Sequence, residues 1–323
     1  MRRGRARASA ALAMTAALGG AALGGAAPGG AGMASAAQVA AWPGGVARAV
    51  AIERAGATAR TAGAVPVVLI VMENEQFASI VGNPNAPFIN HTMIAGGVLD
   101  TDYLAAPGSL PDYLEITSGQ RAPASSAPNL FAALGTAVPW REFMESMPWT
   151  CYKGSSYQHV NGTGWGLYTR YHNPAVQFTS VSATPLCKDV VPLTPASFTP
   201  DALPAFSLVV PNECDDMHTL PADRACPTWT GTVNTAPDAV RMGDNWLASF
   251  VPTVARHATV ILTWDEGSSA NERVATVLYG LGVTPGTDAT AYTHASLEAG
   301  LYAYYGLGIP PGDGATAPPL PIP

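Results

Sequence analysis

The chain has 323 residues, of which 48% are hydrophobic and 12% are charged, and its formal net charge is −7. This composition excludes an intrinsically disordered chain and a coiled coil, and the length is ample for a large hydrophobic core. An acidic chain without a run of lysines and arginines is also a poor candidate for nucleic-acid binding.

The first 37 residues have the pattern of a signal peptide. An Ala/Leu/Gly-rich stretch follows four early arginines and ends near the small residues Ala34-Ser35-Ala36, where cleavage is expected. The stretch is too weakly hydrophobic to serve as a transmembrane anchor. We therefore predict a secreted protein, with Sec and twin-arginine export both open. Residues 38–63 are rich in Ala, Gly and Arg and predict a low-complexity extension.

The alternation of apolar runs and helical patterns predicts an α/β protein. Buried strands are expected at 66–72, near 97–104, and at 205–210, 258–264 and 274–279, with helices beginning near residues 86 and 110 and spanning 237–254 and 294–305. Such an order is typical of a doubly wound, mostly parallel sheet flanked by helices. Residues 120–200 are rich in Pro, Ser, Thr and aromatic residues and predict a loop-rich insertion over the active face. A Pro/Gly-rich tail occupies 309–323.

Two of the predicted strands end in metal-binding side chains. Glu73 and Asn74 follow the first strand, and Asp265 and Glu266 follow the strand at 258–264. Ligands of open α/β sheets bind beyond the carboxyl ends of the strands, and three carboxylates with one amide form a hard oxygen site for one divalent cation. Acidic residues can also simply mark the point where a strand meets a solvated loop. The occurrence of two such pairs favours the metal site, with Mg, Ca, Mn and Fe as candidates.

Ser109 lies where a predicted helix begins, in the sequence Ser109-Leu-Pro-Asp-Tyr113. A serine at the N-cap with Asp112 three residues later is a capping pattern. A helix N-terminus is also an anion site, and a serine hydroxyl next to a divalent metal can attack phosphorus. Both interpretations apply to the same residue.

Asp216 and His218 directly follow the strand at 205–210 and suit metal ligation or general acid catalysis, the alternative being a solvated turn. Asp244 lies in a predicted helix, and His294 begins the last one, where capping or packing would also explain it. Four further histidines have no motif around them and are predicted to be surface or structural: His91, His159, His172 and His257.

The four cysteines are an even number in a chain expected to enter an oxidising compartment, which predicts disulfides. They allow three pairings. We expect Cys151–Cys187 and Cys214–Cys226, which close local loops, whereas a zinc site would lack the C-x-x-C spacing.

Four blocks in this order resemble the bacterial phosphoesterase family of acid phosphatases and phospholipases C, which is related in fold to alkaline phosphatases. The resemblance spans about residues 66–308 and is carried by Met72-Glu-Asn-Glu-Gln-Phe77 with Ala86-Pro-Phe-Ile-Asn90, by Ser109-Leu-Pro-Asp-Tyr113, by Asp216-Met-His218 with Gly243-Asp244, and by Thr263-Trp-Asp-Glu-Gly267.

The resemblance implies roles for the residues in these blocks. Glu73, Asn74, Asp265 and Glu266 would bind the metal, together with the hydroxyl oxygen of the nucleophile Ser109. Asp216 and His218 would lie at the phosphate or leaving group, with the histidine as general acid. Asp244 and His294 would lie in the surroundings of the site.

Two departures from the family pattern bear on function. Relatives carry Asn where this chain has Asp112, and an ionised carboxylate cannot donate a hydrogen bond to a phosphoryl oxygen. We therefore expect Asp112 either to turn away or to alter substrate choice and pH optimum. The segment 268–273 lacks the histidine and glycine pattern of the phospholipase branch, which favours the phosphatase branch. Arg273 is a candidate for offsetting phosphate charge, or for pairing with Glu272.

The sequence thus predicts a secreted, monomeric, metal-dependent phosphoric ester hydrolase acting through a serine nucleophile on small phosphomonoesters. Phosphodiesters, including phospholipid headgroups, are the alternative substrates. A non-catalytic exported binding protein that retains the fold is the alternative of another class. A sulfatase-like hydrolase is disfavoured, because Tyr113 stands where the sulfatase motif requires arginine.

Overall fold

The computed structural model describes residues 64–323 apart from 160–165, 219–225, 232, 235–237 and 268–271. The predicted signal peptide and the predicted low-complexity extension lie outside the described residues, so both stay predictions.

The core of the described part of the chain is a nine-stranded, mostly parallel sheet, as predicted. Its strands run in the order β12-β2-β11-β10-β1-β7-β3-β6, and β13 pairs with β2. Their bounds are β1 Val67–Met72, β2 Val98–Leu104, β3 Trp140–Met144, β6 Val190–Pro192, β7 Phe206–Val210, β10 Thr259–Trp264, β11 Arg273–Gly280, β12 Gly286–Asp288 and β13 Tyr292–Thr293. Two small hairpins stand apart, β4 Ser156–His159 with β5 Gly166–Thr169 and β8 Cys226–Pro227 with β9 Val233–Asn234.

The centre of the sheet is formed by the most hydrophobic runs of the sequence. Every residue of β1, β7 and β10 is buried, because helices cover both faces of these strands. Strand β1 pairs in parallel with β10 on one side and with β7 on the other, and Met72 lies opposite Trp264. The residues that follow β1 and β10 therefore emerge side by side at one edge of the sheet.

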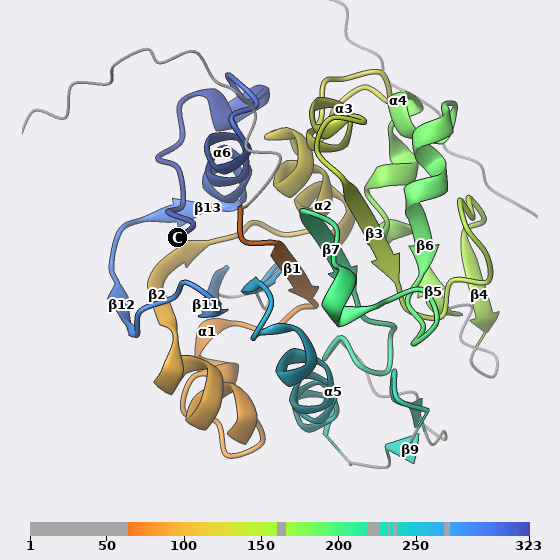
Figure 1. The fold of residues 1–323 in the computed structure, drawn as a ribbon. Helices are drawn as coiled ribbons and strands as arrows, with labels where there is room; N and C mark the ends of the chain where they lie inside the picture. The colour runs from red at the N-terminus through yellow and green to blue at the C-terminus, as the bar shows by residue number, and fades with distance from the viewer. Residues whose placement is uncertain (1–63, 160–165, 219–225, 232, 235–237, 268–271) are drawn as a thin grey trace, which may run out of the picture. The chain divides into compact units, whose positions relative to one another are not determined.

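Helices lie on both faces of the sheet (Figure 1), with α2, α3 and α6 on one side and α1 and α5 on the other. The α-helices are α1 Phe77–Ile80, α2 Ser109–Ser118, α3 Leu130–Leu134, α4 Thr179–Ser182, α5 Ala239–Val254 and α6 His294–Tyr305. A π-helix spans Ile89–Ile94, and short 3-10 helices span Arg170–His172, Ala175–Gln177, Pro185–Asp189, Pro200–Ala202 and Gly312–Ala315. The predicted helices at 237–254 and 294–305 are thereby confirmed.

The segment 120–200, expected as a loop-rich insertion, also supplies two strands of the main sheet. Strand β3 pairs in parallel with β7 and β6. The sequence pattern did not predict β3 because its five residues include Arg141 and Glu142, which interrupt the apolar run. Glu142 is nevertheless fully buried, and burial raises the pKa of its carboxyl well above the usual value.

Both expected disulfides are present, Cys151–Cys187 and Cys214–Cys226. The Pro/Gly-rich tail packs on α6, where Leu320 is buried and its N–H donates to the carbonyl of Ser296. None of the helices in the described segments is long and apolar enough to cross a membrane.

Candidate active site

The predicted site residues come from four strands whose carboxyl ends share one edge of the sheet. Glu73 and Asn74 follow β1, Asp265 and Glu266 follow β10, and the loop after β7 carries Asp216. The pairing continues past the strand ends, because the N–H of Glu73 donates to Asp216 O at 2.8 Å and that of Asp265 donates to Met72 O at 2.9 Å. Strand β2, which ends at the same edge, leads into the N-terminus of α2.

Side-chain oxygens of four residues converge at this edge, and we name the group the oxygen cluster: Glu73, Asn74, Asp265 and Glu266. Asn74 has φ 47°, a left-handed conformation that asparagine tolerates, and its N–H donates to Asp265 Oδ1 at 3.1 Å. The end of the Asn74 amide that faces the carboxylates lies 3.1 Å from Glu73 Oε2, 3.2 Å from Glu266 Oε1 and 3.3 Å from Asp265 Oδ1. With the amide oxygen at this end, the four side chains present only acceptor oxygens to one another, an arrangement that a cation would stabilise.

The alternative orientation of the same amide suits the cation-free protein. With its nitrogen toward the carboxylates, Asn74 donates to them and its oxygen accepts from His218 Nε2 at 3.0 Å. Asn74 thus has suitable partners both with a cation and without one, because an amide can turn either its acceptor oxygen or its donor nitrogen toward the carboxylates.

The electrostatics of the cluster also fit a cation. Glu73, Asp216 and Asp265 are fully buried, and oxygen atoms of all three carboxylates have no hydrogen-bond partner among the described residues. Burial is the main cause that raises the pKa of each carboxyl, to about 7 for Asp265, and neighbouring carboxylates add to the rise for Glu73 and Asp216. A divalent cation would stabilise the ionised forms, so the residues present fit the metal that the sequence implies.

Ser109 is the first residue of α2 and not its cap. The N-cap is Gly108, which has φ 115° and no side-chain capping bond, so the capping interpretation of Ser109 is wrong. The Ser109 hydroxyl instead donates to Glu266 Oε1 at 3.3 Å, while Gly108 N–H donates to Glu266 Oε2 at 2.7 Å. Glu266 therefore holds the start of the helix against the oxygen cluster, and the Ser109 hydroxyl takes no part in capping.

Asp112 is fully buried and pairs with Arg121, whose Nη1 donates to its carboxylate. Arg121 also reaches Glu115 and donates through Nη2 to Pro107 O at 2.5 Å. Burial raises the pKa of Asp112 to about 8, although Arg121 acts in the opposite direction. A proton or the guanidinium thus cancels the negative charge that the substitution of Asn by Asp brings to this position.

The loop after β7 buries Asp216 but leaves His218 exposed. Asp216 Oδ1 accepts from the His218 N–H at 2.9 Å and thereby orders the turn between them. His218 is exposed and lines the cleft in front of Ser109. Partial desolvation of its ring lowers the pKa of His218 below 6.5, while Glu266 acts to raise it.

His172 is a site residue that the sequence pattern did not reveal. Predicted to be surface or structural, it is buried at the end of the 3-10 helix Arg170–His172, with Nε2 at 3.2 Å from Glu73 Oε1 and Nδ1 at 3.6 Å from Glu213 Oε1. Its ring stacks on Tyr113 of α2, with centroids 5.4 Å apart. Burial lowers the pKa of His172 to about 3, so the imidazole is neutral.

Together with Glu213 and Asp216, His172 forms a group whose ligand atoms lie within 4.8 Å of one another and could hold a cation. Glu213 and Asp216 are three residues apart in the loop after β7, but no sequence spacing connects them to His172, which reaches them from a segment without periodicity.

The remaining predicted residues lie around the site. His294 is buried, its Nε2 contacts Asp265 O and its Nδ1 lies 3.0 Å from Tyr103 Oη, so it supports the backbone of Asp265. Capping of α6 is done by Thr293 and Ser296.

Asp244 accepts from the N–H groups of Phe88 and Ile89 at 3.0 and 2.9 Å and ties α5 to the π-helix, apart from the cluster. The Arg273 guanidinium lies over the ring of Phe77 at 4.0 Å.

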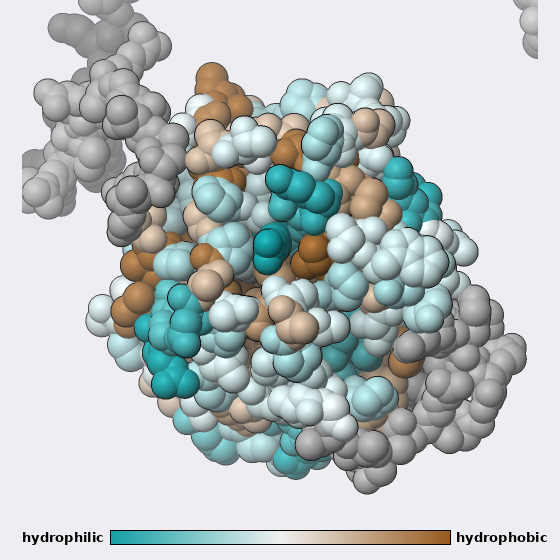
Figure 2. Space-filling view, turned by 45° about the vertical axis from the view of Figure 1, so that its right-hand side comes forward, coloured by the Kyte–Doolittle hydropathy of each residue, from teal (hydrophilic) through white to brown (hydrophobic). Residues whose placement is uncertain are grey.

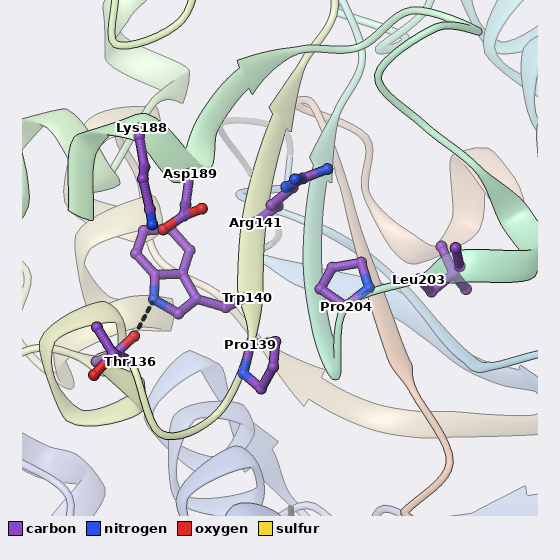
Figure 3. Close-up of a pocket in the computed structure, with 10 residues that line it drawn as sticks. Thr136, Pro139, Trp140, Arg141, Lys188, Asp189, Leu203 and Pro204 are labelled. Carbon is purple, nitrogen blue, oxygen red and sulfur yellow. Dashed lines mark hydrogen bonds between the residues drawn. The ribbon is translucent and has the colours of Figure 1, made fainter. Parts of the chain in front are cut away.

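A cleft of about 400 Å³ opens in front of Ser109, lined by Ser109, Leu110, Pro111, Tyr171, His172, Glu213 and His218. Another cavity, of about 380 Å³, surrounds Trp140 and Arg141, with Lys188 and Asp189 beside the indole (Figure 3). It lies at the amino end of β3, whereas the site residues follow the carboxyl ends, so the two cavities are separate.

Comparisons with known proteins agree with this chemistry. No protein-family model matches the chain. It is 29% identical over 245 residues to the phosphatidylinositol-3-phosphatase of Mycobacterium tuberculosis, covering 71% of this chain and 72% of that protein. It is 28% identical over 247 residues to the phosphate-repressible acid phosphatase of Penicillium chrysogenum, covering 69% of this chain and 49% of that protein, so it spans about half of this second relative.

Among solved structures, a protein in the alkaline phosphatase superfamily from Vibrio parahaemolyticus is similar at 14% identity and a TM-score of 0.47, over 77% of this chain and 68% of that one. This likeness is weak. The two sequence relatives are both named as phosphatases, which agrees with the predicted resemblance to acid phosphatases and indicates a phosphatase-type hydrolase.

Proposed function

We propose that this chain, a phosphatase-type hydrolase by its sequence relatives, is a metal-dependent phosphomonoesterase of the alkaline-phosphatase-like superfamily that uses Ser109 as its nucleophile. The observation that carries the proposal is the position of the Ser109 hydroxyl. It stands at the N-terminus of α2, takes no part in capping and hydrogen-bonds a carboxylate of the oxygen cluster.

In the proposed reaction, Ser109 Oγ attacks phosphorus in line with the departing ester oxygen. The Oγ–P bond forms, the P–O bond to the alcohol breaks, and the serine proton passes to Glu266, which already accepts from the hydroxyl. The first N–H groups of α2 point toward the phosphoryl oxygens and stabilise their negative charge. In the second step a water oxygen bonds to phosphorus and the P–Oγ bond breaks, which releases inorganic phosphate. The proton of the attacking water returns to His218 and Glu266 gives its proton back to Ser109, so the enzyme returns to its starting state.

His218 is the proposed general acid, because it lines the cleft and is exposed enough to reach a leaving alcohol. Its lowered pKa means that the protonated form is abundant only at acidic pH. The residues Glu73, Asn74, Asp265 and Glu266 would hold the cation, with Ser109 Oγ beside it. When bound, a divalent cation lowers the pKa of the serine hydroxyl and neutralises charge on the transferring phosphoryl.

Phosphomonoesters are the proposed substrate class, including the phosphate of a lipid headgroup, since both relatives are named as phosphatases. Export is part of the proposal, supported by the signal-like sequence of residues 1–37 and by the two disulfides, which persist in oxidising compartments.

The test is hydrolysis of p-nitrophenyl phosphate between pH 4 and 9, with added divalent metals or EDTA. We expect chelator-sensitive turnover that is highest at acidic pH, and a loss of roughly a thousandfold or more in kcat for Ser109→Ala. Ser249→Ala, on α5 and away from the cleft, is the control and should behave as the wild type.

Full activity of Ser109→Ala would contradict the proposed nucleophile. Turnover on bis-p-nitrophenyl phosphate but not on the monoester would move the assignment to a phosphodiesterase. Absence of turnover on both esters would favour a non-catalytic binding protein.

A further inference from the structure

An aromatic surface lies beside the cleft. Trp149 is 59% exposed, Tyr157 37% and Tyr171 55%, and Tyr171 itself lines the cleft. Tyr152 connects the group, with ring centroids 4.8 Å from Trp149 and 6.2 Å from Tyr157. Trp and Tyr combine an apolar body with a polar atom, so they suit the boundary between water and an apolar phase.

The stretch of sequence that carries these aromatic residues contains cations and no acidic residue, although the protein as a whole is acidic. No Asp or Glu occurs in the sequence between Glu145 and Asp189, while this stretch holds Lys153, Arg170 and Lys188. The Lys153 ammonium group is exposed and donates to Ser182 O at 2.7 Å, and Arg170 Nη1 donates to Lys153 O at 3.3 Å. Both cations are therefore held by backbone carbonyl groups, in the same part of the chain as the aromatic residues.

The structure fixes this surface next to the catalytic cleft. Arg170 N–H donates to Ser155 O at 2.9 Å and thus joins the 149–157 loop to the 3-10 helix that carries Tyr171 and His172. The Cys151–Cys187 disulfide holds the base of the loop. We name this surface the aromatic rim, with the members Trp149, Tyr152, Lys153, Tyr157, Arg170 and Tyr171.

We propose that the aromatic rim docks the protein on an anionic lipid surface, so that the substrate phosphate is presented to Ser109 from a headgroup in that surface. The exposed Trp and Tyr side chains enter the interface, and Lys153 and Arg170 pair with lipid phosphates. The face shown in Figure 2 carries only small, separate groups of strongly hydrophobic residues. The substrate part of this inference rests on the proposed function, whereas docking does not.

Docking is measured by co-sedimentation of the purified protein with vesicles of phosphatidylcholine alone and with 20% phosphatidylglycerol. We expect binding to the anionic vesicles that weakens as salt rises, because the charge attraction is screened. Trp149→Ala and Lys153→Ala should each reduce the partition coefficient about fivefold or more. Neither residue belongs to the catalytic site, so hydrolysis of p-nitrophenyl phosphate should remain unchanged in both variants.

Two control variants match these changes outside the rim. Ile309→Ala removes an apolar side chain that is 83% exposed, and Arg256→Ala removes an exposed cation before the amino end of β10. Both should bind vesicles as the wild type does. Equal sedimentation of the wild type with and without vesicles, or equal losses in rim and control variants, would overturn the inference. Because no substrate is used, vesicle binding by an inactive protein would refute only the proposed function.

Discussion

Glu298 shows at the scale of one residue how a buried carboxyl outside the site affects stability. It lies on α6, fully buried, and neither of its carboxylate oxygens has a hydrogen-bond partner among the described residues. Burial, with the nearby Glu115 adding to it, raises the pKa of Glu298 to about 9. The carboxyl is therefore protonated in the folded protein at neutral pH and ionised in the unfolded chain.

The sign of the pH effect follows from this shift. A folded-state pKa above the ordinary value of 4.5 means that the native state binds more protons, so stability falls as pH rises from about 4.5 to about 9. Glu298→Gln keeps the shape of the neutral acid and removes this loss. We expect the variant to raise Tm by about 2 °C or more at pH 8 and to have little effect at pH 4.5.

Thermal unfolding of the wild type and Glu298→Gln at the two pH values checks this expectation. Asp313→Asn, an exposed acid near the same helix, is a suitable control. Equal Tm differences at both pH values would mean that ionisation of Glu298 is not the cause.

At the scale of elements, the loop after β7 depends on a covalent closure. Cys214 and Cys226 are twelve residues apart and flank the part of the loop that carries Asp216 and His218. The disulfide reduces the conformational freedom of the unfolded chain, which for a loop of this size is worth about 3 kcal/mol. It also restricts the positions that His218 can take in the cleft.

Replacing both cysteines of this bridge by alanine should therefore lower Tm and also reduce kcat on p-nitrophenyl phosphate, by about tenfold, measured well below Tm. The matched variant lacks Cys151–Cys187, which closes the base of the aromatic rim. It should lower Tm by a similar amount and weaken vesicle binding while leaving kcat close to the wild-type value. Equal effects of the two changes on kcat would show that general destabilisation, and not loop position, is responsible.

At the scale of the whole molecule, four buried or half-buried side chains from two distant parts of the chain meet at one sheet edge and are the proposed metal ligands: Glu73, Asn74, Asp265 and Glu266. Repulsion among the three carboxylates opposes folding, and a bound cation would neutralise it. A ligand that binds only the folded state adds about 2.7 kcal/mol when its concentration is 100 times its Kd. The proposed metal should thus raise the free energy of unfolding as well as support activity.

We expect EDTA to lower Tm by about 5 °C or more relative to protein with saturating divalent metal. Asp265→Asn removes one charged ligand and should abolish most of this difference while retaining the fold, since the amide is similar in shape. Asp201→Asn, an exposed acid paired with His257, should leave the difference intact. Identical Tm values with metal and EDTA in the wild type would contradict a metal at this edge.

Much of the candidate site could be predicted from the sequence because its residues adjoin strongly apolar strands. Glu73 and Asp265 each follow a run that can only be a buried strand, and strands of this kind end at a common edge. The predicted helix at Ser109 likewise begins where the structure has it. The short strand β3 was not predictable, because Arg141 and the buried Glu142 give it the appearance of a polar segment.

The sequence by itself determined the α/β class and the main strands and helices, because these follow from local apolar patterns. It also favoured the two disulfides among three possible pairings, and it pointed to the residues of the oxygen cluster because they directly follow apolar runs. Only the tertiary structure decided that Ser109 is not a cap, that Arg121 offsets the charge of Asp112 and that His172 lies against Glu73. These contacts join segments that share no hydrophobic periodicity, and they form only when the packed sheet brings its loops to one edge. The physical chemistry of the site therefore depends on burial and proximity, which a linear pattern does not record.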